Sequence, residues 1–362
     1  MEPFFRELQE MFERHGRVGA RSSKTISFAT TALRRSVMAR ELYRLRAGKL
    51  IELIDGKCLA QPRYELRSIQ NLKQKHIRAL LKDWLSRDLS AAYIHNMLSM
   101  FRVLAGWVGK PELVGDTVDM VLDPRKKRRQ LVAIRDKSWS GAGINVQEKF
   151  IEIAEDDRGV AMVLLLQWVF GLRLKEAALL HPHLADQGSY IDIARGTKGG
   201  RARVCPVASC EARGALDAAK AFVGDRNGSF VPKGTTYRSY QNRVYYILRK
   251  HGISRSACGV STHGLRHEAL NDLYEKIAGV QSPVRGGKAG EIAAETDRFA
   301  RAQVAEAAGH SRARIAGAYL GSVLGHPRGP RQNQSSAPVL PVSNADSTDQ
   351  QEAKGVTDRG NE

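Results

Sequence analysis

The chain has 362 residues, which is enough for two domains or three small ones. Its hydrophobic fraction of 42% is ordinary for a globular protein and argues against wholesale disorder and against a fibrous protein. The 57 Lys and Arg residues outnumber the 38 Asp and Glu residues and give a net charge of +19, so the first partner to expect is a polyanion, with nucleic acid ahead of an anionic membrane surface.

The cysteines and the apolar segments argue against two other classes of protein. The four cysteines form no C-x-x-C pair, so neither a zinc ribbon nor a disulfide framework is indicated, and a reducing compartment fits. The longest apolar stretch, residues 161–170, is interrupted by Gln167 and is too short to cross a bilayer. The start lacks a basic head followed by an apolar run. We therefore expect a cytoplasmic, nucleoid-associated protein with no membrane partner.

The first residues predict a short amphipathic helix. Phe4, Leu8, Met11 and Phe12 fall on one face of it, and a basic stretch rich in Ser and Gly follows through Lys24. One interpretation makes residues 1–24 a helical arm on a flexible joint. The alternative is that this helix packs on the body of the protein.

Two stronger helical patterns come next. Apolar residues recur at i, i+3, i+4, i+7 and i+8 from Ile77 to Leu85, and a second set runs from Ile94 to Leu104 after the turn residues Asp88 and Ser90. Together with the segment 33–53, they predict an all-helical domain over residues 25–123.

Residues 124–144 are predicted to be a basic linker. Pro124 is followed by five consecutive cations, from Arg125 to Arg129. A charge run is often a solvated face, but this one also suits a linker that lies against phosphates. We predict DNA contacts from Lys126, Lys127 and Arg128.

The second domain is predicted over residues 145–325, mainly helical with one small β-sheet. Residues 190–194 and 202–207 have the pattern of two short strands, and the Gly-rich turn between them presents Lys198 at its tip. Taken alone, Lys198 would be an ordinary solvated turn residue. Residues 326–362 are poor in large apolar side chains and predict a disordered tail. The tail holds four cations and five anions, so the positive charge belongs to the residues before it.

Three further pieces of the second domain place polar residues in apolar surroundings. Arg173 lies between two leucines at the end of an apolar helix, so it needs a partner, either Glu176 or an anion. His263 and Arg266 are three residues apart and share one helical face. The pair Gly309-His310 precedes Tyr319 by nine residues.

Taken in order, these pieces resemble the tyrosine recombinases, which include phage and mobile-element integrases. The motifs are G-L-R-x-x-E at 171–176, a Lys on a β-hairpin, H-x-L-R-H at 263–267, G-H at 309–310, and a following Tyr. The resemblance covers about residues 147–324. It implies the mixed α and β catalytic fold of that family, and the helical domain ahead of it is similar to the family's core-binding domain.

The resemblance also assigns catalytic roles. Arg173 and Arg266 would clamp the non-bridging oxygens of the scissile phosphate, since guanidinium groups meet such oxygens bidentately. Tyr319, the only tyrosine after Tyr274, would attack the phosphorus. His263 would help to remove its proton.

The remaining roles concern the leaving group and the support of the site. Lys198 would protonate the departing 5′-oxygen. His310 would hydrogen-bond the phosphate, while Glu176 and His267 would orient the side chains that contact the phosphate directly. His263 and His267, at i and i+4, have the spacing of two metal ligands on a helix, but no third ligand is apparent in the sequence.

The activity implied is site-specific cutting and rejoining of double-stranded DNA through a 3′-phosphotyrosyl intermediate, for integration and excision of a mobile element. A homotetramer on paired sites, with accessory DNA-bending proteins and without cofactor or metal, would carry it out. Two alternatives remain open. One is a relaxing enzyme like the type IB topoisomerases, and the other is a DNA-binding protein of the same fold that does not cut.

Two more segments are singled out. In residues 235–250, Arg238, Asn242 and Arg243 alternate with tyrosines, which suits a helix that reads base edges in a DNA groove. The alternative is a surface helix whose tyrosines pack inward. The stretch 278–296, rich in Gly and charge, is predicted to be a surface insertion.

Overall fold

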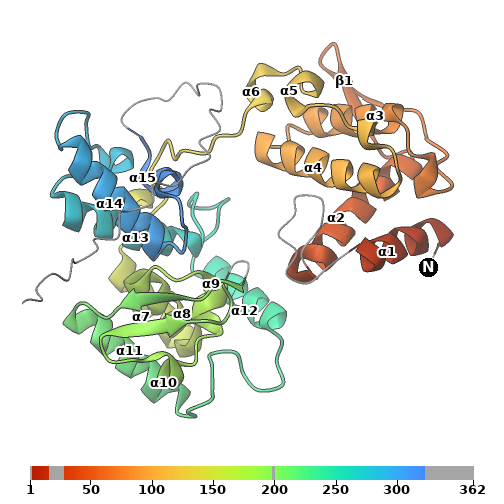
Figure 1. The fold of residues 1–362 in the computed structure, drawn as a ribbon. Helices are drawn as coiled ribbons and strands as arrows, with labels where there is room; N and C mark the ends of the chain where they lie inside the picture. Colours follow the sequence, from red (N-terminus) through yellow and green to blue (C-terminus); the bar gives the residue numbers. More distant parts are fainter. Residues whose placement is uncertain (1, 16–27, 198–199, 323–362) are drawn as a thin grey trace, which may run out of the picture. The chain divides into compact units, whose positions relative to one another are not determined.

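The computed structural model describes residues 2–15, 28–197 and 200–322 (Figure 1). Within these ranges the protein is mainly helical and contains two separate two-stranded antiparallel sheets. The predicted fold class, mainly α with a small β-sheet, is confirmed. Lys198, the basic stretch 17–24 and the predicted tail at 326–362 lie outside the described residues.

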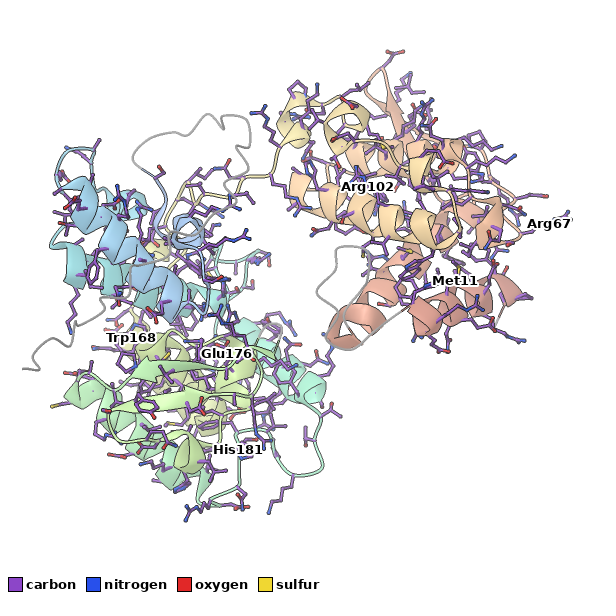
Figure 2. The ribbon with its side chains drawn as sticks, in the orientation of Figure 1. Met11, Arg67, Arg102, Trp168, Glu176 and His181 are labelled. Atoms are coloured by element: carbon purple, nitrogen blue, oxygen red, sulfur yellow. The ribbon has the colours of Figure 1, made fainter. Side chains whose placement is uncertain are left out.

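The elements before residue 128 are, in chain order, α1 (Pro3–His15), α2 (Phe28–Arg46), β1 (Ile51–Ile54), β2 (Lys57–Ala60), the 3₁₀ helix η1 (Ile69–Asn71), α3 (Gln74–Ser86), α4 (Ala91–Trp107), the 3₁₀ helix η2 (Pro111–Leu113), α5 (Thr117–Met120) and α6 (Pro124–Lys127). The longer helices of this part of the chain, α1 to α4, share one hydrophobic core. Trp84 and Phe101 are fully buried at its centre. The apolar face of α1 packs into the same core; Met11, labelled in Figure 2, belongs to it.

A β-hairpin interrupts the helix predicted over residues 33–53. The helix ends at Arg46, and β1 pairs with β2 so that Ile54 lies opposite Lys57. The two residues of the turn, Asp55 and Gly56, both have positive φ angles, 49° and 77°. An Asp-Gly pair is a strong signal for such a tight hairpin turn. The all-helical first domain was therefore wrong in this segment, because a local turn overrode the helical pattern.

The predicted linker is attached at both of its ends. Lys126 forms an ion pair with Asp88 at 2.7 Å, and its carbonyl lies 2.8 Å from His95 Nε2. Further along, Trp139 is buried in the core of the second part and donates from Nε1 to the carbonyl of Ser261 at 2.9 Å. Residues near both ends of 124–144 are thus packed against neighbouring elements.

The second part contains the remaining elements. They are the 3₁₀ helix η3 (Ser140–Ala142), α7 (Val146–Asp156), α8 (Arg158–Phe170), α9 (Leu174–Ala178), α10 (Pro182–Ala185), β3 (Tyr190–Ile193), β4 (Arg203–Pro206), α11 (Cys210–Val223), α12 (Tyr237–Lys250), α13 (His263–Ala278), the 3₁₀ helix η5 (Pro283–Arg285), α14 (Ala294–Ala307), the 3₁₀ helix η6 (Ala313–Ala316) and α15 (Gly317–Leu320). The two strands match the predicted pair at 190–194 and 202–207, with Ile193 opposite Arg203.

Helix α13 connects the two apolar clusters of this part. Its first turn contributes Leu265 to the larger cluster, which α8, α11 and the inner face of β3–β4 build. Its later turns contribute Leu270 and Tyr274 to the smaller cluster, which α14 and α15 complete. In Figure 1, α13, α14 and α15 form the blue group. The functional side chains lie where these two clusters meet. Within the described ranges, every helix is too short or too polar to cross a bilayer.

Candidate active site

The buried carboxylate of Glu176 is the centre of the site. Gly171, with a φ of +60°, ends α8 and lets the chain turn directly into α9. Glu176 lies in the first turn of α9 (Figure 2) and accepts a hydrogen bond from the backbone N–H of Arg173 at 2.8 Å. This reciprocal cap holds the carboxylate at the start of the helix. Glu176 has no exposed surface, so its charge must be compensated by its neighbours.

Three guanidinium groups surround this carboxylate. Arg173 Nη1 lies 2.5 Å from Oε1, Arg203 Nη2 lies 2.9 Å from Oε2, and Arg266 Nη1 lies 3.8 Å from Oε2. Burial alone would raise the pKa of Glu176, but the charges and N–H bonds of Arg203 and Arg173 outweigh it and hold the pKa below its ordinary value. The centre therefore carries three positive charges and one negative charge.

The same arginines also bind the carboxyl end of α14. The carbonyl of Ala308 accepts from Arg173 Nη2 at 2.9 Å and from Arg266 Nη2 at 2.6 Å, while the carbonyl of Ala307 accepts from Arg203 Nη1 at 2.7 Å. Carbonyls at a helix end have no partner within the helix and carry partial negative charge, which suits cations. The arginines thereby fix the loop that begins at Gly309.

Gly309 is required at the start of this loop. Its φ is +69°, and a Cβ there would lie 2.8 Å from Arg203 Cδ. The residue after it, His310, is half-buried, and its backbone N–H bonds the carbonyl of Ala305 at 2.8 Å. The sequence-predicted His310 is thus brought next to the arginine cluster by the backbone.

Tyr319 lies against the first turn of α13. Its hydroxyl oxygen accepts a hydrogen bond from Arg266 Nε at 3.3 Å, and only 7% of the residue is exposed. The rings of His263 and His267 lie 6.0 and 5.0 Å from the tyrosine ring, centroid to centroid. Because positions i, i+3 and i+4 share a helical face, the H-x-L-R-H motif presents His263, Arg266 and His267 together toward the phenol.

Both histidines are held neutral. Protein atoms packed around the ring, reinforced by the charges of Arg266 and Arg173, lower the pKa of His263 to about 4, although the residue is exposed at the surface. His267 is 5% exposed, and burial lowers its pKa to about 3. A neutral imidazole has a lone pair that accepts a proton or a hydrogen bond.

The site therefore gathers six of the eight residues predicted for it: Arg173, Glu176, His263, Arg266, His267 and Tyr319. His310 follows on the adjoining loop, and Lys198 lies outside the described residues. Among the described residues no cluster of three or more His, Cys, Asp or Glu forms a metal site.

Arg203 is the member of the cluster that sequence reasoning missed. Its side chain is 8% exposed and lies 2.7 Å from the sulfur of Cys205, two residues along β4. The sequence contained a signal for this position. Alternate residues of a strand share a face, so Arg203 lies on the same face as Cys205, whose residue type indicates the buried face. A buried Arg on that face must find a carboxylate.

The predicted DNA-contacting helix is α12. Tyr240, Val244 and Leu248 are buried, whereas Arg238 and Asn242 are exposed. Arg243 is also exposed and pairs with Asp157 at 2.5 Å. Tyr240 packs inward, as expected for a surface helix whose tyrosines face the core. Tyr246 is 59% exposed, as expected for a helix that presents tyrosines to DNA. In the linker, Arg128 is exposed and Lys127 half-buried.

Two family models match the sequence. A model described as phage integrase, N-terminal, matches residues 47–114, and a model described as integrase matches residues 133–272. No sequence among the curated proteins matches the chain.

The fold is similar to those of solved integrases. A lambda integrase fragment, solved as a dimer bound to a COC' core site, matches with a TM-score of 0.53 at 15% identity over 91% of this chain and 99% of that chain. The lambda integrase tetramer bound to a Holliday junction matches with a TM-score of 0.53 at 14% identity over 90% of this chain and 79% of that chain. The integrase of transposon Tn1549 with a circular intermediate DNA matches with a TM-score of 0.52 at 13% identity, covering 88% and 95% of the two chains.

Glu176→Gln tests the buried carboxylate. Because the folded pKa lies below the ordinary value of 4.5, the ionised group stabilises the fold above that value, and this contribution is lost as the pH falls through the folded pKa. The variant should be less stable at pH 7 by about 3–5 kcal/mol, since it leaves buried cations uncompensated. It should also lose less stability than the wild type between pH 7 and pH 3. Urea unfolding at several pH values measures both, with Glu155→Gln on the exposed surface as the matched control.

The histidines provide a second test. Proton NMR of the free protein should show His263 and His267 neutral at pH 6, with both imidazoles titrating below the ordinary value of 6.5. Their depressed pKa values mean that protonation opposes folding, so both should charge only in the acid range. An imidazole in this pair that titrates near 6.5 or above would contradict the electrostatics described here.

Proposed function

Because this chain belongs to the integrase family of tyrosine recombinases, we propose that it is a site-specific recombinase that cuts and rejoins DNA through a 3′-phosphotyrosyl intermediate. The observation that carries the proposal is the hydrogen bond from Arg266 Nε to the hydroxyl of Tyr319 in the same chain. A nucleophile and the cation that stabilises its target are thereby brought within reach of each other.

Arg173 and Arg266 are the proposed phosphate clamp. Both are fixed by Glu176 and by the carbonyl of Ala308, so little reorganisation is needed when charge develops on the phosphate oxygens. Guanidinium groups present two parallel donors to such oxygens, which an ammonium group does not. The excess of positive charge at the site supports the binding of a phosphodiester rather than a neutral substrate.

Proton transfer is assigned to groups on either side of the phosphate. Attack by a phenol requires the loss of its proton, and the neutral ring of His263 is suited to receive it. The adjacent guanidinium of Arg266 favours the phenolate. Lys198 is the proposed acid that protonates the departing oxygen. The strands β3 and β4, which flank its turn, connect it to the cluster through Arg203.

The proposed step is balanced without an added reactant. A bond forms between the tyrosine oxygen and phosphorus as the bond to the 5′-oxygen breaks, and the 5′-oxygen leaves as a hydroxyl. The phosphotyrosyl ester keeps the energy of the broken phosphodiester, so attack by another 5′-hydroxyl rejoins the strand. His310 would hydrogen-bond the phosphate, and Glu176 and His267 would orient their neighbours.

The partner proposed is double-stranded DNA at paired recombination sites inside the cell, bound by a homotetramer during integration and excision of a mobile element. The solved structures of lambda integrase described above include a dimer and a tetramer on DNA, which supports this proposal. Exposed Arg238 and Asn242 of α12 are proposed to contact DNA, as are Lys127 and Arg128 in the linker. Arg243 and Lys126 would have to exchange their ion pairs for phosphates.

Tyr319→Phe tests the nucleophile. On a nicked DNA substrate that traps the cut state, the wild-type chain should form a covalent adduct and the variant none, because only the attacking oxygen is removed. Gel mobility under denaturing conditions measures the adduct. Tyr274→Phe is the matched control, since Tyr274 is also buried but donates its hydroxyl hydrogen to Asp297 at 2.6 Å, away from the arginine cluster.

The same experiment separates the alternatives. Absence of any wild-type adduct on its recombination sites would support a DNA-binding protein that does not cut. An adduct with relaxation of supercoils but no recombinant product would support a topoisomerase-like enzyme. Recombinant product from two sites supports the integrase.

Arg266→Lys tests the clamp. Lysine keeps the charge but loses the fork that reaches the phosphate, Tyr319 and Ala308 together, so the cleavage rate should fall by about 10²–10³. DNA affinity, measured by mobility shift, should remain near that of the wild type. Arg226→Lys, on the exposed surface, serves as the control. Unchanged cleavage in Arg266→Lys would contradict the clamp.

A further inference from the structure

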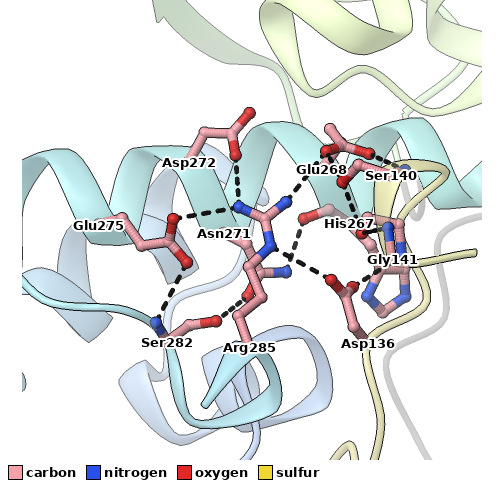
Figure 3. Close-up of polar contacts among 11 residues, drawn as sticks. Asp136, Ser140, Gly141, His267, Glu268, Asn271, Asp272, Glu275, Ser282 and Arg285 are labelled. Carbon is pink, nitrogen blue, oxygen red and sulfur yellow. Dashed lines mark hydrogen bonds and ion pairs between the residues drawn. The ribbon is translucent and has the colours of Figure 1, made fainter. Parts of the chain in front are cut away.

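Arg285, in the segment predicted to be a surface insertion, is the centre of a second charged network (Figure 3). Its guanidinium contacts four carboxylates and its side chain is only 14% exposed. Three of these carboxylates are on α13: Glu268 at 3.1 Å, Asp272 at 2.6 Å and Glu275 at 3.2 Å. The fourth is Asp136, at 3.2 Å, which comes from the linker. One side chain therefore joins α13 and the η5 segment that follows it to the linker, where Asp136 lies 149 positions earlier in the sequence.

A row of buried hydrogen bonds fixes the same segment to α13 behind the active site. Ser282 donates from Oγ to Asn271 Oδ1 at 2.6 Å, and Asn271 donates from Nδ2 to the carbonyl of His267 at 2.7 Å. Ser282 and Asn271 have no exposed surface. The backbone of this segment is consequently tied to the turn of α13 that carries His267, one of the two rings facing Tyr319.

The other side of η5 contacts the segment that carries the tyrosine. A Cβ placed on Gly321 would lie 2.7 Å from Val284 Cγ1 and 3.0 Å from the carbonyl of Ala133, so both lie close against that backbone. The N–H of Ala133 also donates to the carbonyl of Gly317 at 2.8 Å. Helix α15 is thus in contact with η5 through Val284 and with the linker through Ala133.

The length of α15 makes these contacts necessary. It has four residues, and a helix that short does not hold its own geometry in water. The direction of the Tyr319 side chain is therefore determined by what α15 packs against. Asp136, three residues after Ala133, is the point at which Arg285 secures the linker; its other oxygen accepts from the backbone N–H of Ser138 at 2.8 Å.

We propose that Arg285 is a positioning residue for the nucleophile. By joining η5, the linker and α13, it holds together the surface on which α15 packs, which includes Val284 and Ala133, and this surface orients Tyr319 toward the phosphate. This inference rests on the proposed function. Arg285 contacts neither Tyr319 nor the three arginines around Glu176 in any hydrogen bond or ion pair of the described residues. Its effect is therefore exerted only through the surface on which α15 packs.

The test compares Arg285→Lys and Asp136→Asn with the wild-type full-length chain in single-turnover cleavage of the trapping substrate. Lysine cannot contact four carboxylates with a fork of donors, and asparagine keeps the acceptor for Ser138 but loses the charge that binds Arg285. Both variants should lower the rate constant of adduct formation by about 10–100-fold, because small misplacement of a reacting group has effects of that size. The final amount of adduct and the DNA affinity should stay unchanged.

Hydrogen exchange measured by mass spectrometry supplies a second readout that does not depend on chemistry. Exchange should rise in residues 313–321 and 131–136 of both variants and stay unchanged in α8 and α11. Arg213→Lys is the matched control, since Arg213 lies on α11 and forms its ion pairs with Asp186 and Asp217, which belong to neither η5, the linker nor α13. The rate of this variant and its exchange near Tyr319 should equal those of the wild type.

Each outcome distinguishes the two proposals. A wild-type chain without adduct contradicts the proposed function. A wild-type adduct with unchanged rate constants in both variants overturns the role of Arg285. A loss confined to the amount of adduct, with exchange raised throughout the domain, would mean that Arg285 serves only general stability and would overturn it as well.

Discussion

The buried carboxylate of Glu176 is the constraint on which the rest of the site depends. Arg203 and Arg266 are almost without solvent contact, and their positive charges would repel each other and Arg173 if no anion lay between them. Glu176 supplies that anion, and the helix-end carbonyls of Ala307 and Ala308 supply further acceptors. The arrangement connects α9, β4, α13 and α14 at one point, so the elements that carry the functional side chains are held together by the same charges that would act on substrate.

The excess of positive charge has two consequences. It favours an anionic substrate, and it helps to keep His263 neutral, because a further cation beside Arg266 and Arg173 is disfavoured. A neutral imidazole is the form that can take a proton from the phenol. The electrostatics that would suit a phosphodiester therefore also favour the neutral form of the proposed base. Both effects arise from the placement of the arginines.

The proposed nucleophile is held by fewer contacts than the arginines of the proposed clamp. Tyr319 belongs to a four-residue helix, and its position depends on contacts from η5 and from the linker as well as on Arg266. The arginines of the proposed clamp lie against the larger core. The surface on which α15 packs is instead formed by segments whose charged side chains meet at Arg285.

The sequence determined the residues with short-range signals: the helical face of His263, Arg266 and His267, the strands around residue 198, and the partnership of Arg173 with Glu176 three positions away. It also contained the Asp55-Gly56 turn, which a helical pattern obscured. Only the tertiary structure decided that Arg203 enters the cluster and that Ala308 bridges two arginines. It also decided that Arg285, within residues 278–296, contacts four carboxylates. The contact of Arg203 with Glu176 joins residues 27 positions apart, and that of Arg285 with Asp136 joins residues 149 positions apart. Local periodicity carries no information about which distant charges will share a buried site.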